Sequence, residues 1–127
     1  MIWGRKKILI IDDSEIMRTL FYAEFDEEMD IVLASDGTSG LAAVLTEKPD
    51  VIILDINMPD MSGLEVLRQL NSAEETRHIP VVIITGDDFN SVTEREARMQ
   101  KNCKGFLNKL ASSAAIHETV SRALSSV

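Results

Sequence analysis

Short apolar runs, rich in β-branched residues, alternate along the chain with segments whose apolar positions have helical spacing. The runs span residues 8–11, 31–33, 51–54 and 81–84, with a shorter candidate at 105–108. Continuous apolarity over so short a run is typical of a strand that is buried on both faces. The intervening segments predict helices at about 15–27, 37–48, 63–72, 91–101 and 113–125.

This alternation of strand and helix predicts an α/β fold. Because parallel strands are joined through right-handed helical crossovers, repeated units of this kind give a parallel sheet with helices on both faces. Ser14 is placed to cap the first helix, and Pro49 and Pro80 stand just before strands. No repeat or Gly/Ser/Pro linker interrupts the pattern, so we expect one domain over residues 1–127.

Composition and charge limit the function. The apolar fraction of 45% and the charged fraction of 27% are ordinary for a globular domain. The net charge of −8 repels nucleic-acid phosphates and anionic lipid headgroups, so we expect neither nucleic-acid nor membrane binding. No apolar run approaches the roughly 20 residues of a membrane span, and no secretory signal is visible, which favours a cytoplasmic protein.

Several chemically reactive side chains stand at or just beyond the carboxyl ends of the predicted strands, where open parallel sheets bind ligands. They are Asp12, Asp13, Asp55, Thr85 and Lys109. One such Asp could simply cap a helix, but the whole set at one edge indicates a site. Clustered carboxylates repel one another and require a cation, and oxygen ligands without His or Cys favour Mg²⁺, or Mn²⁺. We expect Asp13 and Asp55 as direct ligands and Asp12 to act through water.

Four sequence motifs contain these residues. They are IIDDS at 10–14, LDINMPDMSG at 54–63, PVVIITG at 80–86 and FLNK at 106–109. In this order and on these elements they are similar to the motifs of response-regulator receiver domains, and the resemblance covers essentially the whole chain. It implies a flavodoxin-like, doubly wound (βα)5 three-layer sandwich whose five parallel strands have the order 2-1-3-4-5.

The resemblance also implies a chemistry. Asp55 would be the nucleophile that takes a phosphoryl group from the phosphohistidine of a sensor histidine kinase or phosphotransfer protein, or from a small donor such as acetyl phosphate. Asp12, Asp13, Asp55 and the backbone carbonyl of Asn57 would hold the Mg²⁺. Such a domain is a signalling phosphoacceptor that promotes its own phosphorylation and dephosphorylation, and is not an enzyme with a separate substrate.

After transfer, the resemblance assigns the Thr85 hydroxyl and Lys109 to the phosphoryl oxygens, with the backbone N–H groups of Asn57 and Gly86 adding hydrogen bonds. Thr85 would then move toward the phosphoryl group. Phe106 matches the aromatic residue that swings inward behind it.

The resemblance also implies that the signal is passed on through a surface made by the fourth helix, the fifth strand and the fifth helix. Arg95, Met99 and Phe106 are candidate contacts for a downstream effector or an output domain. Asn57 and Asp87 match positions that tune hydrolysis of the acyl phosphate. The domain would be a monomer or a phosphorylation-dependent dimer.

Two positions depart from the family pattern. Leu110 follows Lys109, where relatives usually have a proline in a cis peptide. A cis peptide before a residue other than proline costs about 2.5–4 kcal/mol, so we expect a trans bond here. Gly86 stands where relatives often have Ala, which widens access to Thr85.

Three other functions share parts of this pattern. An aspartyl-nucleophile phosphohydrolase needs a second acid two residues after Asp55, but Asn57 stands there and cannot donate a proton as a general acid. A flavodoxin-like nucleotide binder needs an anion-binding loop after the first strand, where Asp12 and Asp13 would repel phosphate. The third is a pseudo-receiver, an interaction module that keeps the fold without phosphorylation, and the complete acidic set argues against it.

Overall fold

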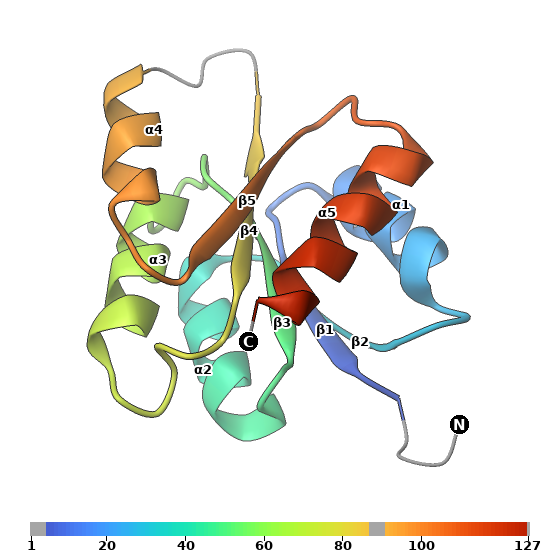
Figure 1. Ribbon diagram of the computed structural model, residues 1–127, viewed down its shortest axis with the longest axis horizontal. Coiled ribbons are helices and arrows are strands. Elements are labelled where there is room, and N and C mark those ends of the chain that lie inside the picture. The colour runs from blue at the N-terminus through green and yellow to red at the C-terminus, as the bar shows by residue number, and fades with distance from the viewer. Residues whose placement is uncertain (1–4, 87–90, 127) are drawn as a thin grey trace.

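The computed structural model describes residues 5–86 and 91–126, in which five strands and five helices alternate strictly (Figure 1). The strands are β1 (Lys7–Ile11), β2 (Asp30–Ala34), β3 (Val51–Asp55), β4 (Val81–Thr85) and β5 (Cys103–Asn108). The helices are α1 (Glu15–Phe25), α2 (Gly37–Glu47), α3 (Gly63–Ser72), α4 (Ser91–Arg98) and α5 (Ser113–Ser125). All pairings are parallel and the order is β2-β1-β3-β4-β5, which confirms the predicted fold.

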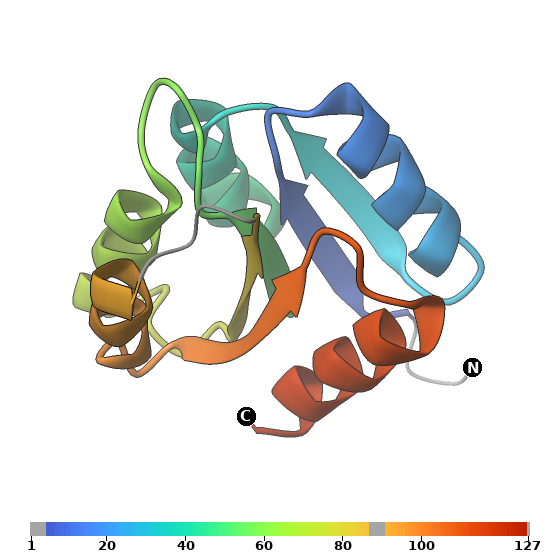
Figure 2. The ribbon, with the colours of Figure 1, turned by 90° about the horizontal axis from the view of Figure 1, so that it is seen from above.

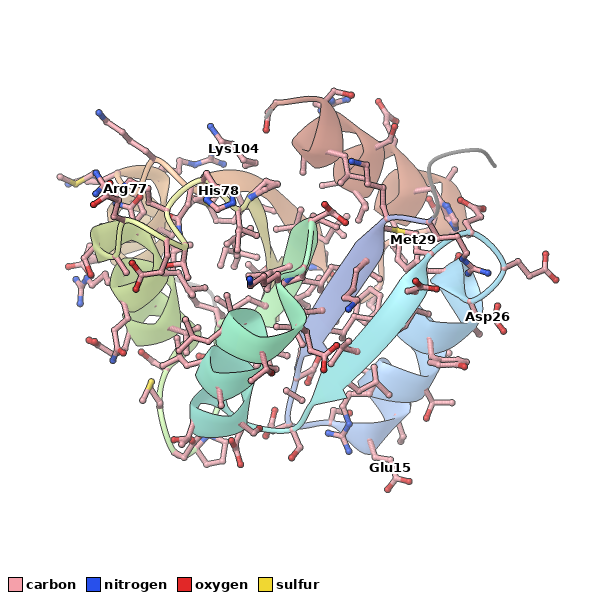
Figure 3. All side chains as sticks on the ribbon, turned by 90° about the horizontal axis from the view of Figure 1, so that it is seen from below. Glu15, Asp26, Met29, Arg77, His78 and Lys104 are labelled. Carbon is pink, nitrogen blue, oxygen red and sulfur yellow. The ribbon has the colours of Figure 1, made fainter. Side chains whose placement is uncertain are left out.

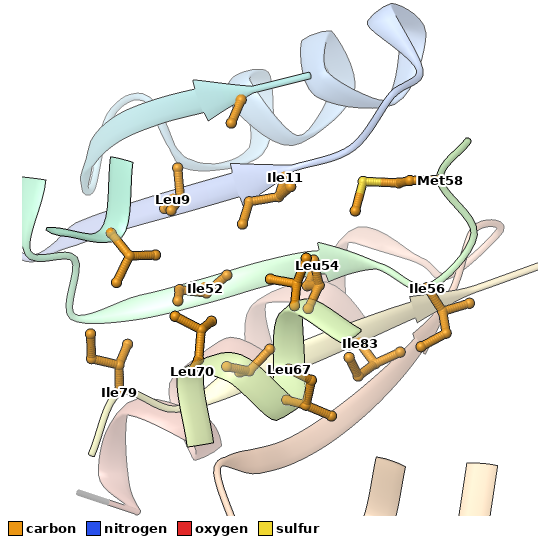
Figure 4. Close-up of a cluster of buried hydrophobic side chains, with 14 of the residues drawn as sticks. Leu9, Ile11, Ile52, Leu54, Ile56, Met58, Leu67, Leu70, Ile79 and Ile83 are labelled. Atoms are coloured by element: carbon orange, nitrogen blue, oxygen red, sulfur yellow. The ribbon is translucent and has the colours of Figure 1, made fainter. Parts of the chain in front are cut away.

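The sheet is the middle layer of a three-layer sandwich. Seen from above, α1 and α5 cover one face, and α2, α3 and α4 cover the other (Figure 2). Side chains alternate between the two faces, so Ile8 and Ile10 pack toward α1 and α5, whereas Leu9 and Ile11 pack toward the other helices. Figure 4 shows this second cluster, in which Leu67 of α3 lies against the sheet.

The fourth helix is shorter than predicted. It ends at Arg98, and the chain turns tightly beyond it, with the Gln100 N–H bonded to the Ala97 carbonyl (3.0 Å). The buried Asn102 then donates its side-chain amide to the Leu67 carbonyl (3.2 Å) and accepts the Val81 N–H on its own carbonyl (2.8 Å). Because these bonds hold the chain beside β4, β5 begins at Cys103, two residues before the predicted run at 105–108.

Two other helix ends differ from the prediction. The first helix stops at Phe25, and the Arg5 guanidinium donates to the Asp26 carbonyl just beyond it (2.7 Å). The second helix stops at Glu47, because Lys48 adopts a left-handed conformation with φ of 49°. The other predicted helices, 63–72 and 113–125, have the observed bounds.

Two local predictions are confirmed. The Ser14 hydroxyl oxygen caps α1 by accepting the Met17 N–H (3.2 Å). Every peptide bond in the described chain is trans, and this includes the bond between Lys109 and Leu110.

The acidic residues of the predicted site lie at one edge of the sheet. Asp12 and Asp13 follow β1 and Asp55 ends β3 at the carboxyl edge, whereas Arg77, His78 and Lys104 lie at the opposite edge (Figure 3), where acidic residues such as Asp30 and Asp50 also stand. Within 5–86 and 91–126, no helix has the length and apolarity required to cross a membrane.

Candidate functional site

Asp12 follows β1 directly, and its side chain is completely buried. Its backbone N–H extends the pairing with β2 by donating to the Ala34 carbonyl (3.1 Å). Its Oδ1 atom accepts the Ser14 N–H (2.9 Å), but its Oδ2 atom has no hydrogen-bond partner within the described residues. A buried carboxylate oxygen of this kind requires a cation or a donor from outside these contacts.

Asp55 ends β3 with the same local geometry. It is completely buried, and its Oδ1 atom accepts the backbone N–H of Asn57 (3.1 Å). The Lys109 Nζ atom lies 3.8 Å from Oδ2, which is close enough for an ion pair but too far for a hydrogen bond. That Oδ2 atom, too, has no hydrogen-bond partner in the part of the chain that the structure describes.

Asp13 completes the cluster. Each of Asp12, Asp13 and Asp55 offers a carboxylate oxygen, and these oxygens lie within 4.8 Å of one another. Asp13 is exposed while the other two are buried, so the cluster is open to solvent at Asp13. Hard oxygen donors at this spacing, two of them with an unpaired buried oxygen, fit a divalent cation of the Mg²⁺ type.

The electrostatics of the cluster agree with this fit. Burial raises the pKa of Asp55 from 3.8 to about 7, and the charge of Asp12 and a hydrogen bond with Asp13 also raise it. The Asn57 N–H and the Lys109 ammonium lower this pKa but do not offset the burial. A cation that binds here must displace the proton of Asp55, so its affinity increases with pH up to about pH 7.

The loop between β3 and α3 lies above the cluster and is held at three points. A Cβ atom on Gly63 would lie 2.2 Å from the Asp55 carbonyl oxygen, so the helix start approaches the strand end as only glycine allows. Met58 is buried in the core. Asp60 accepts the Gly37 N–H at the start of α2 (3.3 Å). These contacts fix the loop that contains Asn57, whose own side chain is exposed.

The β4–β5 side of the site contributes Thr85, Gly86 and Lys109. Thr85 is 7% exposed, and its hydroxyl donates to the Leu107 carbonyl of β5 (3.3 Å). The Lys109 N–H donates to the Thr85 carbonyl (3.0 Å), which places the two residues next to each other. Gly86 is half-buried. The Thr85 hydroxyl must therefore leave the Leu107 carbonyl before it can reach a group on Asp55.

Phe106 lies on β5 beside α4 and is half-buried. The guanidinium carbon of Arg98 stands 4.3 Å from the centre of its ring, a cation–π contact that joins α4 to β5. Arg98 also pairs with Glu94 one turn earlier (2.8 Å). Arg95 and Met99 are exposed next to this contact.

The predicted site residues thus divide into three groups. The structure brings together at one edge Asp12, Asp13, Asp55 and Lys109. Thr85 and Phe106 lie near that edge on β4 and β5, each engaged with another element. Asp87 lies outside the described residues.

Sequence reasoning missed two arginines. Arg18 of α1 donates from Nη1 to the Asp12 carbonyl (2.7 Å), and Arg98 covers Phe106. A cation in the first turn of a helix opposes the helix dipole, and this anomaly could have identified Arg18. No pattern in the sequence links Arg98 to Phe106, because the contact depends on how α4 packs against β5.

Comparison with known families agrees with the fold and the acidic cluster. Residues 8–121 match the family model of the response regulator receiver domain. The chain therefore belongs to this family, whose members are signalling domains of two-component systems.

Three known proteins illustrate the similarity. Response regulator PleD of Caulobacter vibrioides is 38% identical over 104 residues, which is 81% of this chain but only 22% of PleD. The polar-differentiation response regulator DivK of Brucella anthropi is 30% identical over 91% of this chain and 93% of DivK. The crystal structure of the Vibrio cholerae chemotaxis protein CheY4 superposes with a TM-score of 0.85 at 25% identity, covering 94% of this chain and 99% of CheY4.

Proposed function

We propose that Asp55 accepts a phosphoryl group and that the surrounding edge of the sheet converts this modification into a signal. One observation carries the proposal. Asp55 is completely buried, yet one of its carboxylate oxygens is unbonded within 5–86 and 91–126 and lies beside the Lys109 ammonium and the Asp12 and Asp13 carboxylates. A nucleophilic oxygen without a hydrogen bond, next to the Lys109 ammonium and to carboxylates that can hold a cation, suits phosphoryl transfer, which depends mainly on positioning and charge stabilisation.

Asp12, Asp13, Asp55 and the backbone carbonyl of Asn57 are the proposed ligands of Mg²⁺, or of Mn²⁺. When bound, the cation would neutralise charge on the carboxylates and on the phosphoryl oxygens during transfer. Without it, the charges of Asp12 and Asp13 would repel an incoming phosphate.

In the transfer step, the unbonded oxygen of Asp55 attacks phosphorus and forms a P–O bond. The bond from phosphorus to its donor breaks at the same centre. That donor is a histidine nitrogen of a sensor kinase or phosphotransfer protein, or the oxygen of a small acyl phosphate. The leaving group keeps the electron pair of the broken bond and, for histidine, departs with a proton on its ring.

Four groups on this chain are then proposed to hold the phosphoryl oxygens. Lys109 already points at the acceptor, with its Nζ atom 3.8 Å from Asp55. The backbone N–H groups of Asn57 and Gly86 would add hydrogen bonds. The Thr85 hydroxyl would exchange the Leu107 carbonyl, now 3.3 Å away, for a phosphoryl oxygen.

The signal is proposed to leave through α4, β5 and α5. Movement of Thr85 would make room for the Phe106 ring to turn inward, away from Arg98, and would change a surface on which Arg95 and Met99 are exposed. The receiving partner would be a downstream effector or an output domain. Asn57, and Asp87 outside the described residues, are proposed to set the lifetime of the acyl phosphate.

The same proposal treats residues 1–127 as one receiver domain, either a monomer or a dimer that forms on phosphorylation. The chain spans only about a fifth of PleD, so the similarity is to one part of that longer protein.

The direct test is incubation of the protein with acetyl phosphate and Mg²⁺, read by intact mass. We expect a gain of about 80 Da that disappears when Mg²⁺ is chelated before the donor is added. Asp55→Asn should abolish the gain, whereas Asp26→Asn, an equal change at an exposed carboxylate at the end of α1, should leave it intact.

Two outcomes would contradict the proposal: no gain in the wild-type protein, or a gain that persists in Asp55→Asn. The first would favour the pseudo-receiver, which keeps the fold as a binding module only.

A further inference from the structure

Arg18 is the fourth residue of α1 and reaches back over the first turn of that helix. Its backbone N–H makes the first helical hydrogen bond, to the Ser14 carbonyl (3.0 Å). Its guanidinium Nη1 atom donates to the backbone carbonyl of Asp12 (2.7 Å). Helical side chains tilt toward the N-terminus of their helix, so an arginine at this position is directed at the loop that precedes α1.

Helix stability does not account for an arginine here. The N-terminal turn of a helix has a partial positive charge, which favours acidic side chains and disfavours a cation. Glu15 satisfies that preference, and Ser14 caps the helix. Arg18 is half-buried, and its guanidinium contacts the acidic loop. The position of Arg18 is therefore explained by its hydrogen bond to the loop that contains Asp12 and Asp13.

Arg18 completes the set of bonds that orients Asp12. The Asp12 N–H is bonded to the Ala34 carbonyl, and its Oδ1 atom to the Ser14 N–H. With Arg18 on the Asp12 carbonyl, every polar atom of this residue has a partner in the described chain except Oδ2, the atom left for the cation. That carbonyl belongs to the peptide joining Asp12 to Asp13, so Arg18 also fixes the orientation of the exposed Asp13.

We propose that Arg18 is a positioning residue for the cation site: it holds the Asp12–Asp13 peptide so that both carboxylates face Asp55. The inference rests on the proposed function, because it concerns the same cation. Groups that orient metal ligands commonly change metal affinity by 10-fold to 100-fold when removed. Arg18 does so through a carbonyl, which leaves the carboxylate oxygens available.

The direction in which the dissociation constant for Mg²⁺ changes when Arg18 is removed distinguishes a positioning role from a simple charge effect. Removing a positive charge close to three carboxylates strengthens their attraction for a divalent cation, so charge alone would lower the dissociation constant for Mg²⁺. Loss of the orientation of the Asp12–Asp13 peptide would instead raise this dissociation constant. A purely structural role would lower the melting temperature and leave the dissociation constant of the folded protein unchanged.

The experiment is a titration of the ¹⁵N-labelled protein with MgCl₂, followed by NMR and run well below the melting temperature of each variant. Arg18→Ala should raise the dissociation constant by about tenfold. Arg18→Lys, which keeps the charge but offers a shorter donor, should give an intermediate value. Arg122→Ala is the control, since it removes the same charge from an exposed ion pair with Glu118 on α5 and should match the wild type.

A dissociation constant for Arg18→Ala that equals or falls below the wild-type value would overturn the inference. If that variant does not fold, Arg18→Lys decides, and an unchanged value there is equally contradictory. A wild-type protein that binds no Mg²⁺ would contradict the proposed function and this inference together. A second measurement is the rate of phosphorylation by acetyl phosphate. The rates of Arg18→Ala and the wild type should differ at low Mg²⁺ and become equal at saturating Mg²⁺.

Discussion

On the β1–β3 side of the site, Asp12 and Asp55 are both completely buried, and each accepts the backbone N–H two residues further along, at 2.9 Å and 3.1 Å. On the β4–β5 side, the Lys109 ammonium faces Asp55 at 3.8 Å, but Thr85 and Phe106 contact other groups. The Thr85 hydroxyl is bonded to the Leu107 carbonyl, and the Phe106 ring lies under Arg98. Under the proposed function, the first side is arranged for chemistry before any ligand arrives, whereas Thr85 and Phe106 must give up their contacts to respond.

The sheet itself shows the same contrast. All five residues of β3 are buried, whereas β5 has one buried residue and pairs with β4 through a register shift near Val81. Partial exposure and irregular pairing make a strand easier to displace. The proposed acceptor therefore lies on the more buried part of the sheet, and the proposed transmitting residues lie on the more exposed and irregular part.

The largest expected effect comes from Gly63→Ala, on the rigid side. The new Cβ atom would lie 2.2 Å from the Asp55 carbonyl oxygen and 2.7 Å from the Ile56 Cα atom, and backbone cannot move aside. We expect a loss of about 3 kcal/mol or more in the free energy of unfolding, measured by urea denaturation.

Gly105→Ala is the matched change on β5. There the Cβ atom would meet the Thr119 Cγ2 atom of α5 at 2.9 Å, which a small side-chain shift can relieve. We expect a cost of about 1 kcal/mol. Equal costs at Gly63 and Gly105 would contradict the proposed difference in rigidity.

A smaller effect concerns pH. In the protein without Mg²⁺, the pKa of Asp55 is raised from 3.8 to about 7, so the folded state binds a proton that the unfolded chain has released. Stability from this group is full below about pH 4 and is lost as pH rises toward 7. The full shift corresponds to about 4 kcal/mol, and solvent access at Asp13 reduces the expected loss to about 1–3 kcal/mol.

Asp55→Asn isolates the contribution of Asp55 to the pH dependence of stability, because asparagine does not titrate. The free energy of unfolding is measured by chemical denaturation in the presence of a chelator. The value for Asp55→Asn minus the value for the wild type should increase between pH 4 and pH 7. Saturating Mg²⁺ should then stabilise the wild type more than the variant. A difference that stays flat across this range would show that Asp55 keeps an ordinary pKa.

The smallest expected effect is that of Arg98→Gln, on the β4–β5 side. Loss of the cation–π contact should cost about 0.5–1 kcal/mol and free the Phe106 ring, visible as averaged ring signals in NMR. Glu94→Gln removes the ion pair but keeps Arg98 over the ring, so its ring signals should resemble those of the wild type. Matching ring behaviour in Arg98→Gln and wild type would show that Arg98 does not restrain Phe106.

Much of the fold could be predicted because the signal was local. Strands such as 51–54 are continuously apolar, and the motifs at their ends fixed the positions of the acidic residues. The end of α4 could not be predicted, since it depends on Asn102 bonding to Leu67, a residue far away in the sequence. Register and helix ends of this kind are set by tertiary contacts.

The candidate site divides in the same way. Asp12, Asp13 and Asp55 come together because each lies at or just beyond a strand end, and parallel strand ends share an edge. The orientation of the Thr85 hydroxyl, the Arg98 contact and the Arg18 bond depend on side-chain rotamers and neighbouring elements. The sequence therefore predicted which acidic side chains come together, whereas the roles of Thr85 and Phe106 rest on the resemblance to the family.

The most direct test of the contrast is a two-step NMR experiment on one labelled sample, with Mg²⁺ added first and acetyl phosphate second. We expect Mg²⁺ to shift signals around Asp12, Asp13 and Asp55 while those of Phe106 and Arg98 stay in place. Phosphorylation, verified by mass, should then move the Phe106 and Arg98 signals. Movement of Phe106 on Mg²⁺ alone, or none after phosphorylation, would contradict the division between a preformed acceptor side and a responsive β4–β5 side.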